Sequence, residues 1–141
     1  HDRLDPALLP PLVVAWRAEC AESSGIAHAE LRARFDAGDP VVQECVAELA
    51  ALAFSARDAL LGRDDDRFAS AVDRTFDLRA RMMRLDPSHV AMIDCAHGAG
   101  AAANYTGSGG AIVAVCVDED HRHAVVDALL MHGCDVLTTP A

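Results

Sequence analysis

The residues best suited to chemistry in this sequence form one short run, Thr106-Gly107-Ser108-Gly109-Gly110. Glycine permits positive φ angles and a close approach of the backbone to a ligand, and successive N–H groups can form a nest that binds an anion. The hydroxyls of Thr106 and Ser108 would add donors to such a nest. On this basis alone the run is either a tight turn between two strands or a phosphate-binding loop, although one or two glycines suffice for a turn.

Two better-known nucleotide-binding motifs are excluded. Residues 98–103 match the spacing G-x-G-x-x-A, but they follow an expected helix and precede an expected strand, whereas the dinucleotide motif follows a strand and opens a helix. The Walker loop needs a lysine, and all 12 residues in the Lys+Arg total of this chain are arginines. The absence of lysine also excludes Schiff-base chemistry.

The charge balance argues against polyanionic partners. The chain has 22 Asp and Glu residues against 12 arginines, which gives a formal net charge of −10 at pH 7. Such a surface repels nucleic acid and anionic membranes, and no apolar run approaches the length of a membrane span. We therefore expect neither nucleic acid nor a membrane as a partner.

The five cysteines are scattered, odd in number and never spaced as C-x-x-C. This pattern favours reduced, buried thiols in a cytoplasmic protein. Cys95-x-His97 and His121-x-His123 place potential metal ligands in pairs, but no third or fourth ligand follows at a zinc-site spacing. We therefore expect no metal site.

Hydrophobic periodicity and turn residues predict the elements that must position the glycine run. Asp39-Pro40 and Asp86-Pro87 each predict a helix start, because aspartate caps exposed N–H groups and proline fits the first helical position. The predicted strands span residues 12–16, 101–106, 112–117 and 134–138, and the predicted helices span 26–37, 40–62, 64–83, 87–98 and 120–132.

Two of these helices carry an apolar stripe at helical spacing, which predicts the faces that they bury. In the helix over 40–62 the stripe consists of Val42, Cys45, Val46, Leu49, Ala53, Ala56 and Leu60. In the helix over 64–83 it consists of Phe68, Val72, Phe76, Ala80 and Met83.

The order of these elements is strand, four helices, two strands, helix, strand. It predicts an α+β fold, a ferredoxin-like antiparallel sheet with additional helices inserted after the first strand. No repeat, low-complexity tract or linker divides the sequence, so we expect residues 1–141 to form a single domain. The glycine run would then join two adjacent strands of the sheet.

A longer stretch around the glycine run resembles a known motif. Residues 100–113, GAAANYTGSGGAIV, are similar to the third, C-terminal glycine motif of the GHMP kinases, the family of galactokinase, homoserine kinase, mevalonate kinase and phosphomevalonate kinase. The form TGSGGA, with Phe76-Asp77-Leu78-Arg79 and the pattern Ser24-Gly25-x-x-His28-x-x-Leu31-Arg32-x-Arg34-Phe35 upstream, resembles glucuronokinase-like sugar kinases within that family. These stretches keep the expected order and cover the chain from about Leu9 to Val117.

The resemblance implies the C-terminal domain of a kinase, ferredoxin-like and with additional helices. It implies that the glycine run lies beside the phosphate loop of an N-terminal half and helps to shape the phosphate and acceptor site. That half is expected to hold a P-x-x-x-G-L-G-S-S-type loop, the catalytic aspartate and the magnesium ligands. ATP and Mg²⁺ would therefore bind to the full-length enzyme, and we expect neither a cofactor nor a catalytic residue in this chain alone.

The partners implied are the chain's own N-terminal kinase half and a sugar or sugar-acid substrate. A start at His1 fits an excised or truncated C-terminal domain. Such a domain would expose the apolar surface that once met its partner, so a homodimer formed through that surface is a further expectation.

The candidate phosphate-side residues are Asn104 and the run from Thr106 to Gly110. The family usually has lysine at the position of Asn104, so an amide replaces a positive charge there. Arg79 is the preferred substrate-side residue, because its planar guanidinium suits a carboxylate or phosphate; an ion pair with Asp73 or Asp77 is the alternative. His28 matches the family pattern on the acceptor side, and its alternative is a capping or packing role.

Two functions are compatible with the sequence. The first is the C-terminal domain of an ATP-dependent kinase for a sugar or sugar-acid hydroxyl. The second is a noncatalytic ferredoxin-like binding or dimerisation module, in which the glycine run only turns the chain. Asn104 in place of lysine favours the second slightly, and the three matching stretches favour the first.

Overall fold

The helix starts lie where the sequence predicts them. The computed structural model describes residues 4–18 and 25–139, with backbone only at 25–28. Asp39 caps helix α2 (Pro40–Gly62) by accepting hydrogen bonds from the N–H groups of Val41 and Val42, at 3.0 and 3.3 Å. Asp86 caps α4 (Pro87–Gly98) through the N–H of Ser88, at 2.7 Å. Both predicted Asp-Pro starts are confirmed.

The other elements also agree with the sequence to within a few residues at each end. The helices are α1 (Gly25–Asp36), α3 (Asp65–Met82) and α5 (Glu119–Met131). The strands are β1 (Leu12–Trp16), β2 (Ala102–Tyr105), β3 (Ala111–Val115) and β4 (Asp135–Thr138). A short 3-10 helix, η1 (Pro6–Leu8), precedes β1 and was not predicted.

The strands form a four-stranded sheet in the order β2-β3-β1-β4. Every neighbouring pair is antiparallel, and Val14 of β1 lies opposite Val113 of β3 on one side and Leu137 of β4 on the other. This order, with helices inserted between β1 and β2, is the predicted ferredoxin-like arrangement. The α+β fold class is therefore confirmed.

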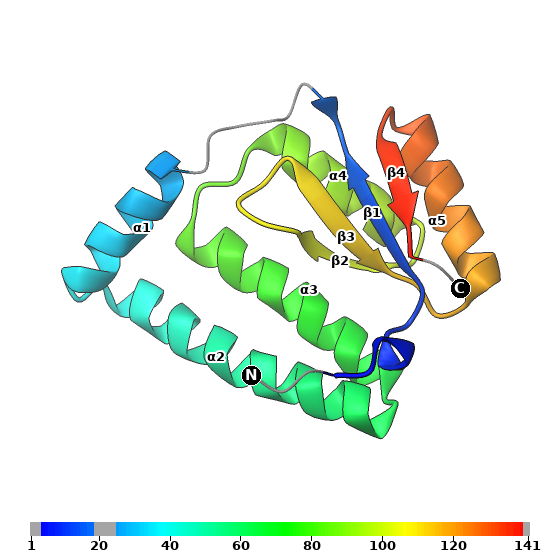
Figure 1. Ribbon diagram of the computed structural model, residues 1–141. Coiled ribbons are helices and arrows are strands. Elements are labelled where there is room, and N and C mark those ends of the chain that lie inside the picture. Colours follow the sequence, from blue (N-terminus) through cyan, green and yellow to red (C-terminus); the bar gives the residue numbers. More distant parts are fainter. Residues whose placement is uncertain (1–3, 19–24, 140–141) are drawn as a thin grey trace.

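One face of the sheet is covered by α3, α4 and α5, and α2 lies beyond α3 (Figure 1). Val13 and Ala15 of β1 are buried beneath these helices, because alternate residues of a strand point to opposite faces. On the other face Val14 is half-buried and Trp16 is 36% exposed. None of the described helices covers this second face, which we call the open face.

Helix α3 is the middle layer between the sheet and α2. Its Phe76 belongs to the core beneath the sheet, and its Leu78 and Met82 are buried with Val42 and Cys45 of α2. Helix α3 therefore has two apolar faces, one packed against the sheet and one packed against α2, although a single stripe was predicted. The glycine run follows β2 and is contacted by α3 through Arg79.

Parts of the two predicted stripes are wrong. Val46 and Ala53 of α2 are exposed, because α2 packs chiefly against α3 and buries only a narrow face. Ala59 of α2 is buried although the stripe omitted it. Ala80 of α3 is also exposed, since the helix turns that position toward neither the sheet nor α2.

Among the described residues, the helices are either too short or too polar to cross a membrane.

Candidate functional site

The glycine run forms the connection between β2 and β3, and we call residues 106–110 the glycine loop. Its base is closed by the N–H of Thr106, which donates to the carbonyl oxygen of Ala111 at 3.1 Å. The Thr106 hydroxyl also lies 3.4 Å from that oxygen. The loop is therefore a hairpin turn. Its glycine conformations and its backbone N–H groups bear on whether it could also bind an anion.

Two glycines of the loop have positive φ angles, +143° at Gly109 and +79° at Gly110. L-residues rarely adopt these conformations, so glycine is needed at both positions. The N–H groups of Gly107, Ser108 and Gly109 donate to no acceptor in the part of the chain that the structure describes. Successive backbone donors of this kind are the components of an anion-binding nest.

Arg79 holds the loop from the side of α3. Its Nη1 donates to the carbonyl oxygen of Gly107 at 2.6 Å. Burial lowers the pKa of this guanidinium, but an arginine in a protein remains charged. The structure thus brings Arg79 into contact with the glycine loop, through Gly107.

The alternative for Arg79, an ion pair with Asp73 or Asp77, is wrong. Asp73 instead accepts hydrogen bonds from the N–H of Ala103, at 2.8 Å, and from Nε2 of His97, at 3.0 Å. Its carboxylate therefore links α3 to β2 and to the end of α4. Arg79 instead forms its hydrogen bond with the glycine loop.

Asn104 lies on the other side of β2. Its neighbours Ala103 and Tyr105 are buried beneath the helices, so the Asn104 side chain belongs to the open face. Its Oδ1 accepts a hydrogen bond from the N–H of Tyr105 at 2.8 Å. Asn104 is thus near the start of the loop in sequence, but on the opposite face of the sheet from Arg79.

His28 lies in α1, and its side chain is outside the described residues. Its predicted place on the acceptor side therefore stays a prediction.

Sequence reasoning missed two residues beneath the loop, Tyr105 and His89. Tyr105, the last residue of β2, is 4% exposed, and burial, with a smaller effect of Asp86, raises its pKa to about 12. His89, in the first turn of α4, is 4% exposed and packs edge-to-face against Tyr105. The only sequence signal for His89 is its place after the Asp86-Pro87 helix start, which does not indicate a contact with the loop.

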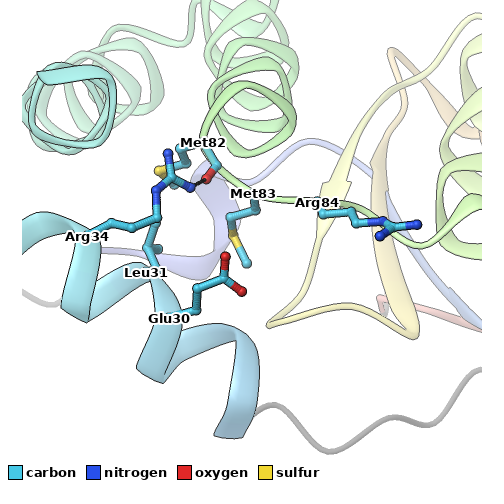
Figure 2. A pocket seen from close by; sticks show the side chains of 6 residues that line it. All are labelled: Glu30, Leu31, Arg34, Met82, Met83 and Arg84. Atoms are coloured by element: carbon cyan, nitrogen blue, oxygen red, sulfur yellow. Dashed lines mark hydrogen bonds between the residues drawn. The ribbon is translucent and has the colours of Figure 1, made fainter. Parts of the chain in front are cut away.

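A small pocket lies elsewhere, where α1 meets the end of α3 (Figure 2). Its volume is about 60 Å³, whereas sites for small ligands are usually about 300–1,000 Å³. Arg34, on its wall, already donates to the carbonyl oxygen of Met82 at 2.6 Å and pairs with Asp39 at 2.9 Å. This pocket is small for a ligand and its Arg34 is already paired, so the glycine loop is the better candidate site.

The sequence of residues 56–132 matches the family model described as the C-terminal domain of GHMP kinases. The match spans more than half of the chain, and the fold and the glycine loop agree with it. The chain belongs to the GHMP kinase C-terminal family. The family resemblance stated from the motifs is confirmed.

Among curated relatives, the chain is similar to two proteins of Arabidopsis thaliana. It is 40% identical to probable glucuronokinase 2 and 36% identical to glucuronokinase 1, each over 116 residues. These matches cover 80% of this chain but only 31% and 32% of the two relatives. The chain therefore spans about a third of their length.

Solved structures share the fold at low sequence identity. A Lin0012 protein from Listeria innocua superposes with a TM-score of 0.77 at 17% identity, over 94% of this chain and 41% of that one. L. major mevalonate kinase, solved with R-mevalonate, gives a TM-score of 0.75 at 21% identity, over 86% of this chain and 38% of that one. At these identities the likeness supports the fold alone.

Proposed function

We propose that this chain is the C-terminal domain of an ATP-dependent kinase that phosphorylates a hydroxyl group of a sugar or sugar acid. Membership of the GHMP kinase family supports the reaction class. The similarity to two glucuronokinases supports a sugar acid as the acceptor. Because the matches cover 31% and 32% of those relatives, the rest of the enzyme would be an N-terminal kinase half.

The observation that carries the proposal is the set of unused donors in the glycine loop. The N–H groups of Gly107, Ser108 and Gly109 have no acceptor among the described residues. A backbone N–H without an acceptor must be satisfied by water or by a ligand. Phosphate oxygens would satisfy all three, as they do in a nest of successive backbone N–H groups.

Phosphoryl transfer depends mainly on positioning and on the stabilisation of charge. ATP with Mg²⁺ would supply the phosphoryl group. The loop N–H groups and the Ser108 hydroxyl would donate to its oxygen atoms, and donors fixed in advance stabilise developing negative charge most effectively. No three His, Cys, Asp or Glu side chains lie together in a metal-binding cluster within the described part of the chain. We therefore expect the magnesium ligands to come from the N-terminal half.

Arg79 would serve the acceptor as well as the loop. One of its N–H groups donates to Gly107, and the guanidinium has further donors available for a second acceptor group. A carboxylate of a sugar acid would fit this planar set of donors. The lysine that the family usually has at position 104 is absent, so the positive charge beside the loop would come from Arg79, on the other face of the sheet.

The proposal is tested with the protein encoded by the complete reading frame. It is incubated with ATP, Mg²⁺ and matched pairs of sugars, such as glucuronic acid with glucose and galacturonic acid with galactose. We expect phosphorylation of at least one uronic acid at a higher kcat/KM than that of its neutral counterpart. Absence of phosphorylation of every sugar and sugar acid would contradict the proposed substrate class.

The role of the loop is tested with Gly109→Val in the same protein. A valine cannot adopt the φ angle of +143° without strain, so the loop must change conformation. We expect kcat/KM for ATP to fall by about 100-fold, which is the scale of a misplacement of about 1 Å. Unchanged turnover would show that the loop does not approach the reacting groups.

A further inference from the structure

The space that a side chain at position 109 would need is occupied by His89. A Cβ atom built on Gly109 would lie 2.6 Å from Nδ1 and 3.0 Å from Cε1 of the imidazole ring. Real Cβ atoms essentially never approach another atom to less than 3.0 Å. The backbone of the glycine loop therefore rests directly on the His89 ring, and only glycine permits this contact.

The His89 ring is itself held firmly. It is 4% exposed, and its backbone N–H donates to the carbonyl oxygen of Asp86 at 3.1 Å. The ring packs edge-to-face on Tyr105, with centroids 5.9 Å apart and an interplanar angle of 89°. Tyr105 packs in turn on Phe76, at 5.5 Å and 71°. These three rings connect α4, β2 and α3 beneath the loop.

The loop is thus supported at two points. His89 fills the space under Gly109, and Arg79 binds the carbonyl oxygen of Gly107 at 2.6 Å. The N–H groups of residues 107–109, which have no acceptor among the described residues, lie in the segment between these supports. Any movement of the His89 ring would therefore move the donors proposed to bind phosphate.

We propose that His89 is a positioning residue for the glycine loop. Its imidazole ring sets the position of Gly109 and, through it, the position of the N–H groups that meet the phosphate. The proposal rests on the proposed kinase function for its consequence in catalysis, but the contact between His89 and the loop can be tested separately. His89 acts through the loop and need not contact the substrate.

The test is a double-mutant cycle of Gly109→Ala and His89→Ala in the complete protein. Gly109→Ala places the new methyl group against the ring, and we expect kcat/KM for ATP to fall by about 100-fold. Adding His89→Ala vacates the space, so we expect the double variant to be about tenfold more active than Gly109→Ala. The recovery is incomplete, because alanine still resists the φ angle of +143°.

Gly100 and His121 provide the matched control. Gly100 also has a positive φ angle, +85°, but a Cβ there would lie 3.5 Å from Nε2 of His121, which is an ordinary contact. Because a methyl group at position 100 would meet no steric conflict with the His121 ring, we expect no recovery in the double variant of Gly100→Ala and His121→Ala. Independent effects of Gly109→Ala and His89→Ala in the first cycle would overturn the proposal.

A second measurement covers failure of a variant to fold and separates this proposal from the kinase function. In ¹H–¹⁵N spectra of this chain, His89→Ala should shift the signals of Gly107, Ser108 and Gly109, whereas His121→Ala should leave them in place. Unchanged loop signals in His89→Ala would overturn the positioning role. A wild-type protein without kinase activity would overturn the proposed function, and the spectra would still decide the role of His89.

Discussion

Arg79 holds the glycine loop, and in the proposed kinase it would also bind the acceptor; the geometry of arginine permits both roles at once. The guanidinium has five N–H donors in one plane, and the loop carbonyl uses one of them, over 2.6 Å. A lysine could keep the charge, but it could not hold the loop and a second acceptor in the same plane. The effect of the positive charge of Arg79 can therefore be distinguished from the effect of its planar shape by substituting lysine, which keeps only the charge.

We predict that Arg79→Lys lowers kcat/KM for ATP and acceptor together in the complete protein, by roughly tenfold or more, because an ammonium group lacks the planar set of donors. Arg79→Ala should have a larger effect. Arg84 is the control, since it is exposed and donates to no described group; its side chain extends away from the pocket in Figure 2. Equal effects of Arg79→Ala and Arg84→Ala would contradict the assignment.

A second prediction concerns buried groups that resist ionisation. Burial raises the pKa of Cys116 to about 11 from its ordinary 9.0, and that of Tyr105 to about 12 from 10.0. The unfolded chain therefore releases these protons at a lower pH than the folded chain. The stabilisation is complete below pH 9 and is lost as the pH rises from 9 toward 12.

We therefore expect the melting temperature to fall across that alkaline range, and Cys116→Ala to reduce the fall between pH 9 and 11. Native Cys116, which is 1% exposed, should also resist alkylation at pH 8 and react after unfolding in urea. Peptide mapping of the alkylated chain measures this. Rapid alkylation of Cys116 in the folded chain would contradict the predicted burial.

At the scale of elements, α3 is the part on which the site depends. It carries Phe76 into the core beneath the sheet, Leu78 into the contact with α2, and Arg79 to the loop. Because these neighbouring residues contact the sheet, α2 and the loop, α3 must be held in place by both the sheet and α2. Loss of the α2 contact should therefore disturb the loop as well as stability.

We predict that Leu78→Ala, at a fully buried position, lowers the free energy of unfolding by about 2–5 kcal/mol. Val46→Ala is the matched control. Val46 was assigned to the core from the sequence but is 36% exposed, so its truncation should cost less than about 0.5 kcal/mol. Urea denaturation of the two variants measures both values, and equal losses would contradict the packing of α2 on α3.

Much of this architecture could be predicted from the sequence. The Asp-Pro pairs identify helix starts by local chemistry, and the strands of β2 and β3 are recognisable from their apolar composition around the glycines. The stripe of α2 was less predictable, because the number of helices packed around α2 decides whether Val46 is buried. The contact of His89 with Gly109 was not predictable, because it depends on the distance between α4 and a loop from a different part of the chain.

At the scale of the whole molecule, the sheet has one covered and one open face. Trp16, the single tryptophan, lies on the open face and is 36% exposed. Leu137, also on this side, is 62% exposed. The homodimer expected from the sequence stays a prediction, and this face is the apolar surface through which it would form.

Trp16 provides a direct measurement of that prediction. In dilute solution its fluorescence should be quenched efficiently by acrylamide. If the chain pairs through the open face, quenching should weaken as the protein concentration rises, and Val14→Asp should abolish this dependence. Sedimentation of a monomer at every concentration, with constant quenching, would contradict the homodimer.

The central position of β1 also has a consequence for the time course of folding. Its two neighbours in the sheet are β3 and β4, which begin at Ala111 and Asp135, so β1 leaves the ribosome long before either partner. The intervening helices α2 and α3 are neighbours in the sequence and pack against each other, so they can form before β3 and β4 are available. Since non-local pairing slows folding, we expect helical circular dichroism to recover early in refolding. The fluorescence change of Trp16, at the end of β1, should come last.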